Sequence, residues 1–206
     1  LFFWIKKNID TKYLTEMTIS QKLYEIRKLN ETFISESFST ISAFNDNGAI
    51  VHYKVNKMSD KKIDCDGLYL IDTGAHYLEG TTDVTRTLLV GKAKVEMIED
   101  YTDVLKGHIA VATAIFPEKT FGREIDSFAR KQLWKKGKDY AHGTGHGVGS
   151  LLSVHEGPIS ISKHSESYLE CGMVVSNEPG YYKTGEYGIR IENLEVVKRK
   201  YFKNQN

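Results

Sequence analysis

Residues 68–90 read LYLIDTGAHYLEGTTDVTRTLLV, and this stretch decides how the central part of the chain folds. Apolar and β-branched residues run up to Asp72 and resume after Asp83, which predicts two strands. The connection between these strands contains glycine and is long enough to turn the chain back on itself. In an antiparallel pair centred on this connection, Asp72 and Asp83 lie opposite each other and point to one face of the sheet.

A second carboxylate pair has the same arrangement in residues 173–193, which read MVVSNEPGYYKTGEYGIRIEN. Glu178 ends the first apolar run of this stretch, and Glu192 lies in the second run. The midpoint between them is Gly185, inside a turn-like Lys-Thr-Gly-Glu sequence. We therefore expect Glu178 and Glu192 to oppose each other in the same way.

Two pairs of opposed carboxylates need something to neutralise them, because like charges directly opposite each other destabilise a sheet. Either the acids hold protons at a raised pKa, or they bind a cation. Any one of these acids taken alone is explained more simply as a solvated hairpin residue. Four acids at mirrored positions beside apolar strands favour a site in which carboxylates bridge two metal ions.

A glycine-rich segment supplies a further ligand candidate. Residues 142–149 read HGTGHGVG, and this glycine density argues against a helix and allows the backbone to approach a ligand closely. No Lys-Ser or Lys-Thr pair follows, so the segment is not a phosphate-binding P-loop. One imidazole with four carboxylates is an oxygen-rich ligand set that suits manganese and is compatible with cobalt, iron or zinc.

The rest of the pattern predicts helices and short strands. One helix starts at Thr18, where Thr18 and Gln21 have capping-box spacing, and two more are expected over 96–116 and 122–135. Strands are expected over 40–44, 49–53, 68–72, 83–90, 173–177 and 189–197. This order of elements indicates the α+β class, built from two similar halves of about 100 residues each.

Composition argues against some partners. The 206 residues are 40% hydrophobic and 27% charged, with 28 basic against 27 acidic residues, so nothing in the charge balance suggests nucleic acid or a membrane as a partner.

The two cysteines, Cys65 and Cys171, are expected as free thiols. The apolar start of the chain is too short for a signal peptide or a membrane span. We expect a cytoplasmic protein and, because the chain begins without methionine, a piece of something longer.

The sequence around these acids and histidines resembles the motifs of Xaa-Pro aminopeptidases, most closely those of the large cytosolic type. The resemblance runs from about Phe3 to about Val197 and rests on LIDTGA at 70–75, GTTDVTRT at 80–87, HGTGHGVG at 142–149, VHEG at 154–157, NEPGYY at 177–182 and GIRIEN at 188–193. It implies a pita-bread fold, with two pseudo-symmetric halves around a curved antiparallel sheet. It also implies a single metallopeptidase catalytic domain over 1–206, with its core at about 15–200 and without the N-terminal domains of the family.

The resemblance implies roles for individual residues. Five of them would be ligands of two divalent metal ions, usually manganese: Asp72, Asp83, His146, Glu178 and Glu192. In the family pattern Asp83 and Glu192 bridge the two ions. Glu178 is also implied as a catalytic proton shuttle, and His155 as the donor to the scissile carbonyl of the bound substrate or its tetrahedral adduct.

Other candidate residues concern the substrate. His52 and His142 match family positions that line the substrate pocket, although His52 read alone is a histidine at a strand end. Arg190 lies two residues before Glu192 and so faces the same side of a strand, where it could contact substrate and orient the carboxylates. His108 falls on the apolar stripe of a predicted helix, and we expect it simply to pack there.

The implied reaction is hydrolysis of the N-terminal Xaa-Pro peptide bond through a metal-activated water. The substrates would be peptides with proline at the second position, and a homodimer of the full-length enzyme stays an open expectation. Prolidase, which cleaves Xaa-Pro dipeptides, and methionine aminopeptidase share the five ligands and are alternatives. A non-catalytic pita-bread domain that binds peptides is a third alternative, although such relatives typically lose ligands.

Overall fold

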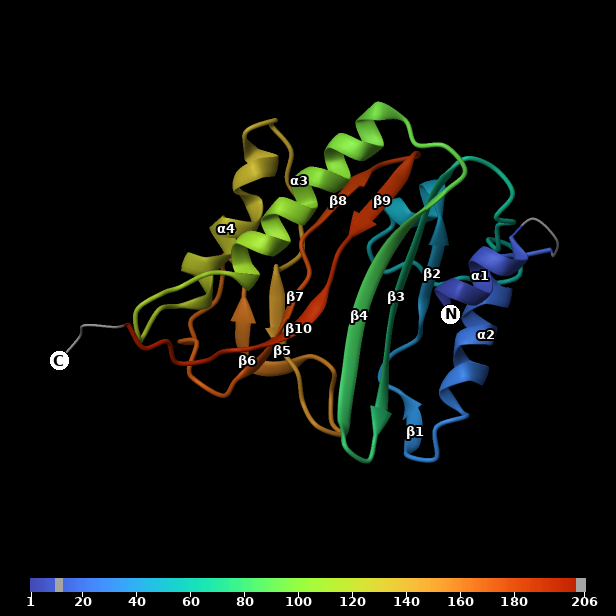
Figure 1. The fold of residues 1–206 in the computed structure, drawn as a ribbon. Coiled ribbons are helices and arrows are strands. Elements are labelled where there is room, and N and C mark those ends of the chain that lie inside the picture. The colour runs from blue at the N-terminus through green and yellow to red at the C-terminus, as the bar shows by residue number, and fades with distance from the viewer. Residues whose placement is uncertain (10–12, 203–206) are drawn as a thin grey trace.

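The computed structural model describes residues 1–9 and 13–202, and the end of the expected domain at 203–206 lies outside them. Its helices are α1 (Phe2–Asn8), α2 (Glu16–Arg27), α3 (Val95–Ala112), α4 (Gly122–Trp134) and a 3₁₀ helix, η1 (Asn45–Ala49). Its strands are β1 (Phe33–Glu36), β2 (Ile41–Phe44), β3 (Gly67–Tyr77), β4 (Gly80–Val90), β5 (Gly145–Gly147), β6 (Glu156–Ile161), β7 (Val174–Asn177), β8 (Gly180–Lys183), β9 (Tyr187–Arg190) and β10 (Asn193–Val196). Figure 1 shows the strands in the middle, with α1 and α2 on one side and α3 and α4 on the other.

Within the described residues the strands form two four-stranded sheets and one hairpin, all with antiparallel pairing. In the first sheet, β3 pairs with β4 along its whole length on one edge, while β1 and β2 share the other edge. The second sheet has the order β10-β7-β5-β6, and β8 and β9 form the hairpin. Helices packed outside antiparallel strands confirm the predicted α+β class.

Separate hydrophobic clusters hold the helices on the strands. The first joins α1 and α2 to β2 and β3 and contains Ile5, Leu14, Ile19, Phe44, Ile63, Tyr69 and Ile71. The second joins α3 and α4 to the second sheet and contains Val111, Ile125, Ala129, Ile161, Leu169 and Val175. Helices α3 and α4 approach closely at Gly107, where a Cβ would lie 2.2 Å from the carbonyl oxygen of Ala129. Fully burying one such apolar side chain contributes about 1.5–3 kcal/mol, so these clusters fix where each helix lies.

Helix α2 starts earlier than the sequence pattern predicted. The hydroxyl of its N-cap, Thr15, accepts from the N–H of Thr18 at 3.1 Å, and the Thr18 hydroxyl accepts from the N–H of Thr15 at 2.7 Å. The predicted capping box of Thr18 and Gln21 is therefore wrong, because Thr18 is the third residue of the helix rather than its cap. The two later helices are confirmed as α3 and α4, although α3 ends at Ala112 instead of Phe116.

The strand predicted over 49–53 is wrong. This segment leaves η1 and turns, because its last residue, Tyr53, and the preceding Asn47 bond to a buried carboxylate instead of joining a sheet. Glu16 accepts hydrogen bonds from the Asn47 amide at 3.0 Å and from the Tyr53 hydroxyl at 2.8 Å. These bonds to α2 fix the turn that carries His52.

The β3–β4 hairpin has a different register from the predicted one. Asp72 pairs with Thr85, and Asp83 pairs with Gly74, so the two aspartates are diagonal neighbours rather than direct partners. The strands run on to a two-residue connection, which moves the centre of the hairpin by one position. Because side chains alternate along a strand, Asp72 and Asp83 still point to the same face.

The second carboxylate pair lies in the predicted register. The β7–β10 ladder and the β8–β9 ladder share one register, and Glu178 and Glu192 lie opposite each other in the break between the two ladders. The turn that joins β8 to β9 contains Gly185, as predicted. Its φ of 75° is in the left-handed region that favours glycine.

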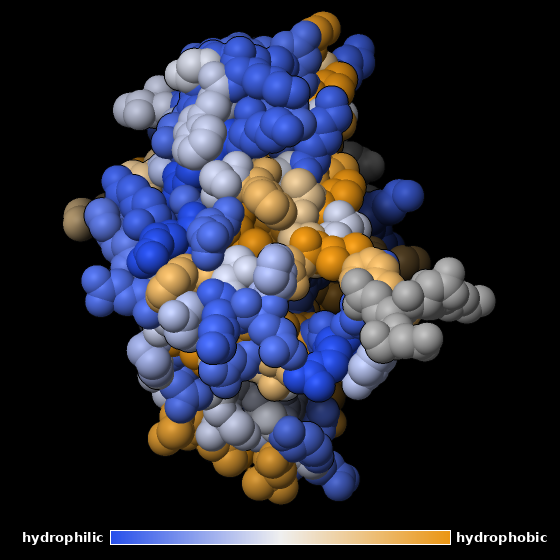
Figure 2. Space-filling view, turned by 90° about the vertical axis from the view of Figure 1, so that its left-hand side faces the viewer, coloured by the Kyte–Doolittle hydropathy of each residue, from blue (hydrophilic) through white to orange (hydrophobic). Residues whose placement is uncertain are grey.

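The surface is mainly polar on the side that lies at the left of Figure 1. Figure 2 shows that hydrophilic residues cover most of this face, while hydrophobic residues gather in its middle and along its lower edge. Cys65 and Cys171 are exposed and free, as predicted. Among the described residues, none of the helices has both the length and the apolarity needed to cross a membrane.

Candidate metal centre

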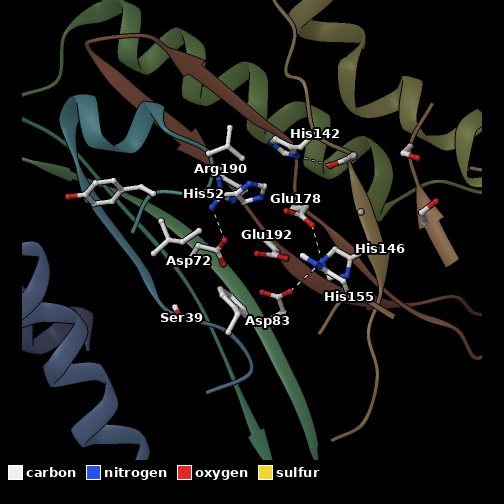
Figure 3. Close-up of a pocket in the computed structure, with 18 of the residues that line it drawn as sticks. Ser39, His52, Asp72, Asp83, His142, His146, His155, Glu178, Arg190 and Glu192 are labelled. Carbon is white, nitrogen blue, oxygen red and sulfur yellow. Dashed lines mark hydrogen bonds and ion pairs between the residues drawn. The ribbon is translucent and has the colours of Figure 1, made fainter. Parts of the chain in front are cut away.

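The five expected metal ligands line one pocket of about 680 Å³. We call them the ligand cluster: Asp72 from β3, Asp83 from β4, His146 from β5, and Glu178 and Glu192, which lie just outside β7 and β10. Figure 3 shows their side chains pointing toward one another from both halves of the molecule. The long hairpin alone supplies two of the acids, and the C-terminal strands supply the rest.

Within the ligand cluster the polar atoms are close to one another. The Nε2 atom of His146 lies 3.1 Å from Oε1 of Glu178 and 3.5 Å from Oδ2 of Asp83. One ligand atom each from Asp83, His146 and Glu192 lie within 4.8 Å of one another, which is close enough for a single ion to contact all three.

Burial and mutual repulsion raise the pKa of three of the acids. Burial raises the pKa of Asp83 to about 6, although its hydrogen bond with His146 opposes this. Burial and the charges of the neighbouring carboxylates raise the pKa of Glu192 well above its ordinary value. The pKa of Asp72 is also raised, because burial outweighs the attraction of Arg190. A cation bound nearby would lower the pKa of each of these acids and displace its proton.

The pKa values of His146 and Glu178, unlike those of the three acids, shift so that each group's charged form is favoured. Burial lowers the pKa of His146, but its hydrogen bonds to Asp83 and Glu178 outweigh burial and raise that pKa to about 10. Burial raises the pKa of Glu178, yet the His146 ring outweighs burial and lowers it. A proton thus lies where these side chains converge, and a metal ion would compete for the same lone pairs.

The residues present fit a pair of divalent cations. The Oδ1 atom of Asp72 is buried and has no hydrogen-bond partner in the described structure, and a bound cation would supply one. Four carboxylates and one imidazole form a mainly oxygen donor set, which suits manganese and is compatible with cobalt, iron or zinc.

Three neighbouring side chains orient the acids. Arg190 donates from Nη2 to Oδ2 of Asp72 at 2.7 Å. The hydroxyl of Thr85 donates to Oε2 of Glu192 at 2.7 Å. The hydroxyl of Ser176 donates to Oε1 of Glu178 at 2.9 Å, and it accepts from the N–H of His146 at 3.0 Å. Sequence reasoning missed Thr85 and Ser176, although each lies two residues from a ligand and so on the same face of its strand.

The three histidines expected to contact substrate, His52, His142 and His155, also line the pocket. The His155 ring meets the His146 ring edge to face, with centroids 4.1 Å apart, and burial followed by the charge of His146 lowers the pKa of His155. His142 is held on both sides, by the carbonyl oxygen of Gly143 at 2.7 Å and the hydroxyl of Tyr182 at 2.8 Å. His52 is exposed at the rim. Figure 3 shows His142, His146 and His155 on the side opposite Asp72.

One wall of the pocket is apolar and was not predicted. It contains Phe38 in the approach to β2, Ile41 in β2 itself and Val51 beside His52. Sequence gave no signal for these positions, because an apolar residue in or near a strand is usually part of a core.

His108 packs inside the protein, as predicted, but it also makes specific hydrogen bonds. Its Nδ1 atom lies 3.1 Å from the carbonyl oxygen of Asn177, and its Nε2 atom lies 3.1 Å from Nδ2 of Asn193. Since a carbonyl oxygen only accepts, Nδ1 carries the proton and Nε2 accepts from the amide. His108 thereby fastens α3 to the strands that flank Glu178 and Glu192.

The chain belongs to metallopeptidase family M24, whose family model matches residues 1–199. It is 50% identical over 202 residues to a probable Xaa-Pro aminopeptidase P of Paracoccidioides brasiliensis (strain Pb03), covering 96% of this chain and 33% of that protein. It is also 50% identical over 196 residues to Xaa-Pro aminopeptidase 1 of Dictyostelium discoideum, covering 94% of this chain and 31% of that protein. The resemblance is confirmed, and the chain spans about a third of the length of these curated relatives.

Solved structures agree with this family. X-prolyl aminopeptidase from Caenorhabditis elegans, described as a cytosolic enzyme with a di-nuclear active site, matches with a TM-score of 0.89 and 44% identity over 94% of this chain and 32% of that chain. Prolidase from Pyrococcus furiosus matches with a TM-score of 0.83 and 33% identity over 91% of this chain and 54% of that chain. These matches confirm the pita-bread fold.

Proposed function

We propose that this chain is the catalytic unit of an Xaa-Pro aminopeptidase, which releases the first residue of peptides that have proline at the second position. The carrying observation is the ligand cluster, in which four acids and one histidine from distant parts of the sequence line one pocket. The 50% identity to proteins named Xaa-Pro aminopeptidases supports the same reaction. Since the chain spans about a third of those relatives, the activity of the whole protein is part of the proposal.

The ligand cluster is proposed to hold two divalent ions, with manganese as the first choice. Asp72, Asp83, His146, Glu178 and Glu192 would hold these ions, and Asp83, His146 and Glu192 already offer ligand atoms within 4.8 Å of one another. When bound, such ions supply the Lewis acidity that makes water a nucleophile near neutral pH and polarises the peptide carbonyl. The raised pKa values of Asp72, Asp83 and Glu192 support this, because a cation can take the place of a proton there.

Proton transfer is assigned to Glu178. Its pKa is lowered, so its carboxylate is ionised at neutral pH and can accept the proton of the attacking water. The same group can then return that proton to the leaving proline nitrogen. His155 is assigned to the carbonyl oxygen: its lowered pKa keeps the ring neutral, and a neutral imidazole still donates one N–H as charge develops.

Selection of proline is assigned to the apolar wall of Phe38, Ile41 and Val51. Proline has no amide N–H, so an apolar slot can accept it without leaving a donor unsatisfied. The exposed side chains of His52 and Lys54 at the rim mark an open end of the pocket. An open end admits peptides longer than a dipeptide, which favours an aminopeptidase over a prolidase.

Location and organisation are proposed by analogy. We assign the protein to the cytosol because the Caenorhabditis elegans enzyme is described as cytosolic. The catalytic unit is proposed to be a single domain over residues 1–206, with its core at about 15–200. A homodimer is proposed only for the longer enzyme.

The test combines metal binding with peptide cleavage on the same preparation. Manganese titration should give two sites per chain, and the loaded protein should release the first residue of an Xaa-Pro-Xaa tripeptide but spare the matching Xaa-Ala-Xaa peptide. Glu178→Gln should stay folded and lose most turnover.

Cleavage restricted to Xaa-Pro dipeptides would favour prolidase, and release of methionine without a second-position proline would favour the methionine enzyme. Binding of Xaa-Pro peptides without any cleavage would favour the non-catalytic alternative.

A further inference from the structure

Helix α4 contains a buried ion pair that lies outside the ligand cluster. Asp126 and Arg130 are 3% and 5% exposed, and two hydrogen bonds of 2.7 and 3.0 Å join the guanidinium to the carboxylate. A buried ion pair often adds no net stability, because both groups lose their hydration. Its presence here therefore points to a specific conformation that the pair enforces.

The guanidinium of Arg130 also holds the chain that follows α4. It donates to a carboxylate oxygen of Asp139 at 2.8 Å and to the carbonyl oxygens of Tyr140 at 2.6 Å and His142 at 2.8 Å. Two contacts to Asp126 and three to these residues match the five N–H groups of an arginine. A lysine at this position could make at most three such bonds.

Asp126 holds the same segment two residues further on. Its Oδ1 atom accepts from the hydroxyl of Thr144 at 2.6 Å, and this hydroxyl also contacts the Tyr140 hydroxyl. The carbonyl oxygen of Thr144 in turn accepts from the N–H of Glu178 at 2.7 Å. Two residues after Thr144 comes His146. Asp126 is thus connected to two members of the ligand cluster through the backbone of Thr144.

The aromatic rings of this segment also contact Arg130 and each other. The Arg130 guanidinium lies 3.9 Å from the centroid of the Tyr140 ring, whose centroid is 4.8 Å from that of the His142 ring. His142 must donate from Nδ1 to the carbonyl oxygen of Gly143, so its Nε2 accepts from the hydroxyl of Tyr182. The imidazole in the pocket is therefore fixed in both orientation and tautomer.

We propose that Asp126 and Arg130 are positioning residues for this site: they fix residues 139–146, here called the anchored segment, so that His142, His146 and Glu178 reach the pocket. Neither residue of the pair lines that pocket. The effects on turnover and on metal affinity rest on the proposed function, whereas the effect on the anchored segment does not.

Two variants and one control test the proposal in the full 206-residue chain. Arg130→Lys keeps the charge opposite Asp126 but removes donors to the anchored segment, and Thr144→Val removes one hydroxyl while keeping the side-chain shape. Arg27→Lys is the control, because Arg27 is 8% exposed, lies in α2 and pairs with Glu36 at 3.6 Å, away from the pocket. Each variant and the control are measured at temperatures that lie equally far below their own thermal unfolding midpoints.

The first readout is amide hydrogen exchange without metal. Arg130→Lys and Thr144→Val should speed exchange at His146 and Glu178 by at least about tenfold relative to amides of α2, whereas Arg27→Lys should not. Manganese affinity, measured by calorimetry, should fall about 10- to 100-fold in both variants, as expected when groups that orient metal ligands are removed. Equal effects of Arg130→Lys and Arg27→Lys on the anchored segment would overturn the proposal, and so would unchanged exchange and affinity in Thr144→Val.

Turnover provides a second, separable readout. In an active parent, Arg130→Lys should lower kcat per folded molecule by about 10- to 100-fold, because small displacements of reacting groups are costly. A purely structural role would lower the unfolding midpoint and leave kcat per folded molecule unchanged. If the parent binds manganese but cleaves no Xaa-Pro peptide, the proposed function fails, and exchange and affinity alone decide the positioning role.

Discussion

The two carboxylate pairs reach the pocket from different kinds of backbone. Asp72 and Asp83 project from β3 and β4, which pair without interruption over eleven residues each. Glu178 and Glu192 lie in the break between two ladders of four residue pairs each. The first pair is oriented by its own hairpin, whereas the second depends on segments that are distant in sequence.

Backbone contacts make this dependence concrete. The N–H of Glu178 donates to the carbonyl oxygen of Thr144 at 2.7 Å, and the N–H of Glu192 donates to that of Thr85 at 3.2 Å. The backbone N–H groups of both acids therefore donate to carbonyl oxygens of other segments, because the regular ladder is interrupted at these positions. A long hairpin fixes side-chain direction locally, whereas an interrupted one must be fixed by the tertiary structure.

The two pairs also differ in their neutralisation. Asp72 has a buried cation beside it, since Nη2 of Arg190 lies 2.7 Å from its Oδ2 atom. The carboxylate of Glu192 accepts from the hydroxyl of Thr85, and the nearby acids repel its charge. Without metal, Arg190 thus offsets part of the cost of burying the charge of Asp72, whereas the neighbouring acids add to the burial that favours the protonated form of Glu192.

The largest effect on stability is expected for Arg190→Met, which removes the compensating cation. Asp72 stays buried without its partner, so the metal-free protein should lose about 3–5 kcal/mol of unfolding free energy. Urea unfolding with and without manganese measures this, and manganese should restore part of the loss. Arg199→Met is the control, because the Arg199–Glu118 pair is exposed and solvent screens its attraction, so it should contribute little to stability. Equal losses in the two variants would contradict the assigned role of Arg190.

The second prediction compares one acid from each pair. Glu192→Gln should weaken manganese binding by about 100-fold or more, beyond the effect of losing an orienting neighbour. The same variant should raise the unfolding midpoint without metal, because an uncompensated buried acid is gone. Asp72→Asn should instead lower that midpoint, since it leaves Arg190 buried without its charge partner.

Calorimetry and thermal unfolding decide this second prediction on the same samples. Glu195→Gln is a matched control, because Glu195 lies on β10 and its pKa is also raised by burial, but it does not line the pocket. Shifts of the same sign in Glu192→Gln and Asp72→Asn would remove the difference between the two pairs.

A smaller effect is expected from removing single hydroxyl groups. Thr85→Val and Ser176→Ala should each cost about 1–2 kcal/mol of unfolding free energy, because buried partners lose a hydrogen bond. Only Ser176→Ala should speed amide exchange at His146, since that N–H donates to the Ser176 hydroxyl. Exchange at His146 that responds equally to both variants would show that the interrupted and the regular regions are equally coupled.

The smallest expected effect is a pH dependence in the region of the second pair. Burial lowers the pKa of His108, whose Nε2 already accepts from Asn193. As pH falls below the ordinary histidine value of about 6.5, the unfolded chain takes up a proton before the folded one does, so stability is lost. The loss is at most about 1.4 kcal/mol per pH unit until the folded pKa is reached.

Urea unfolding at pH 5.5 and 7.5 measures this loss, and the difference between the parent and His108→Gln isolates it from other titrating groups. The parent should lose more stability on acidification than His108→Gln does. A parent and variant with parallel pH profiles would show that His108 does not link protonation to the stability of this region.

The sequence by itself determined the face on which each acid lies. Side-chain alternation along apolar runs put Asp72 and Asp83 on one face despite a register error of one position at the turn. It also placed Glu178 opposite Glu192, because a glycine turn at their midpoint fixes that pairing. These features depend on contacts within about twenty residues, where periodicity and turn chemistry carry the information.

The tertiary structure decided the remaining features, because their partners lie far apart in sequence. Residues 49–53 have strand-like composition, yet the buried carboxylate of Glu16 accepts from Tyr53 within this segment and from Asn47 before it, and so turns the chain away from a sheet. The pairing of Arg190 with Asp72 spans 118 residues. The hydrogen bonds from Asp126 and Arg130 to the anchored segment likewise depend on how α4 packs. Local patterns fix which way a side chain points, but only packing decides which distant group it meets.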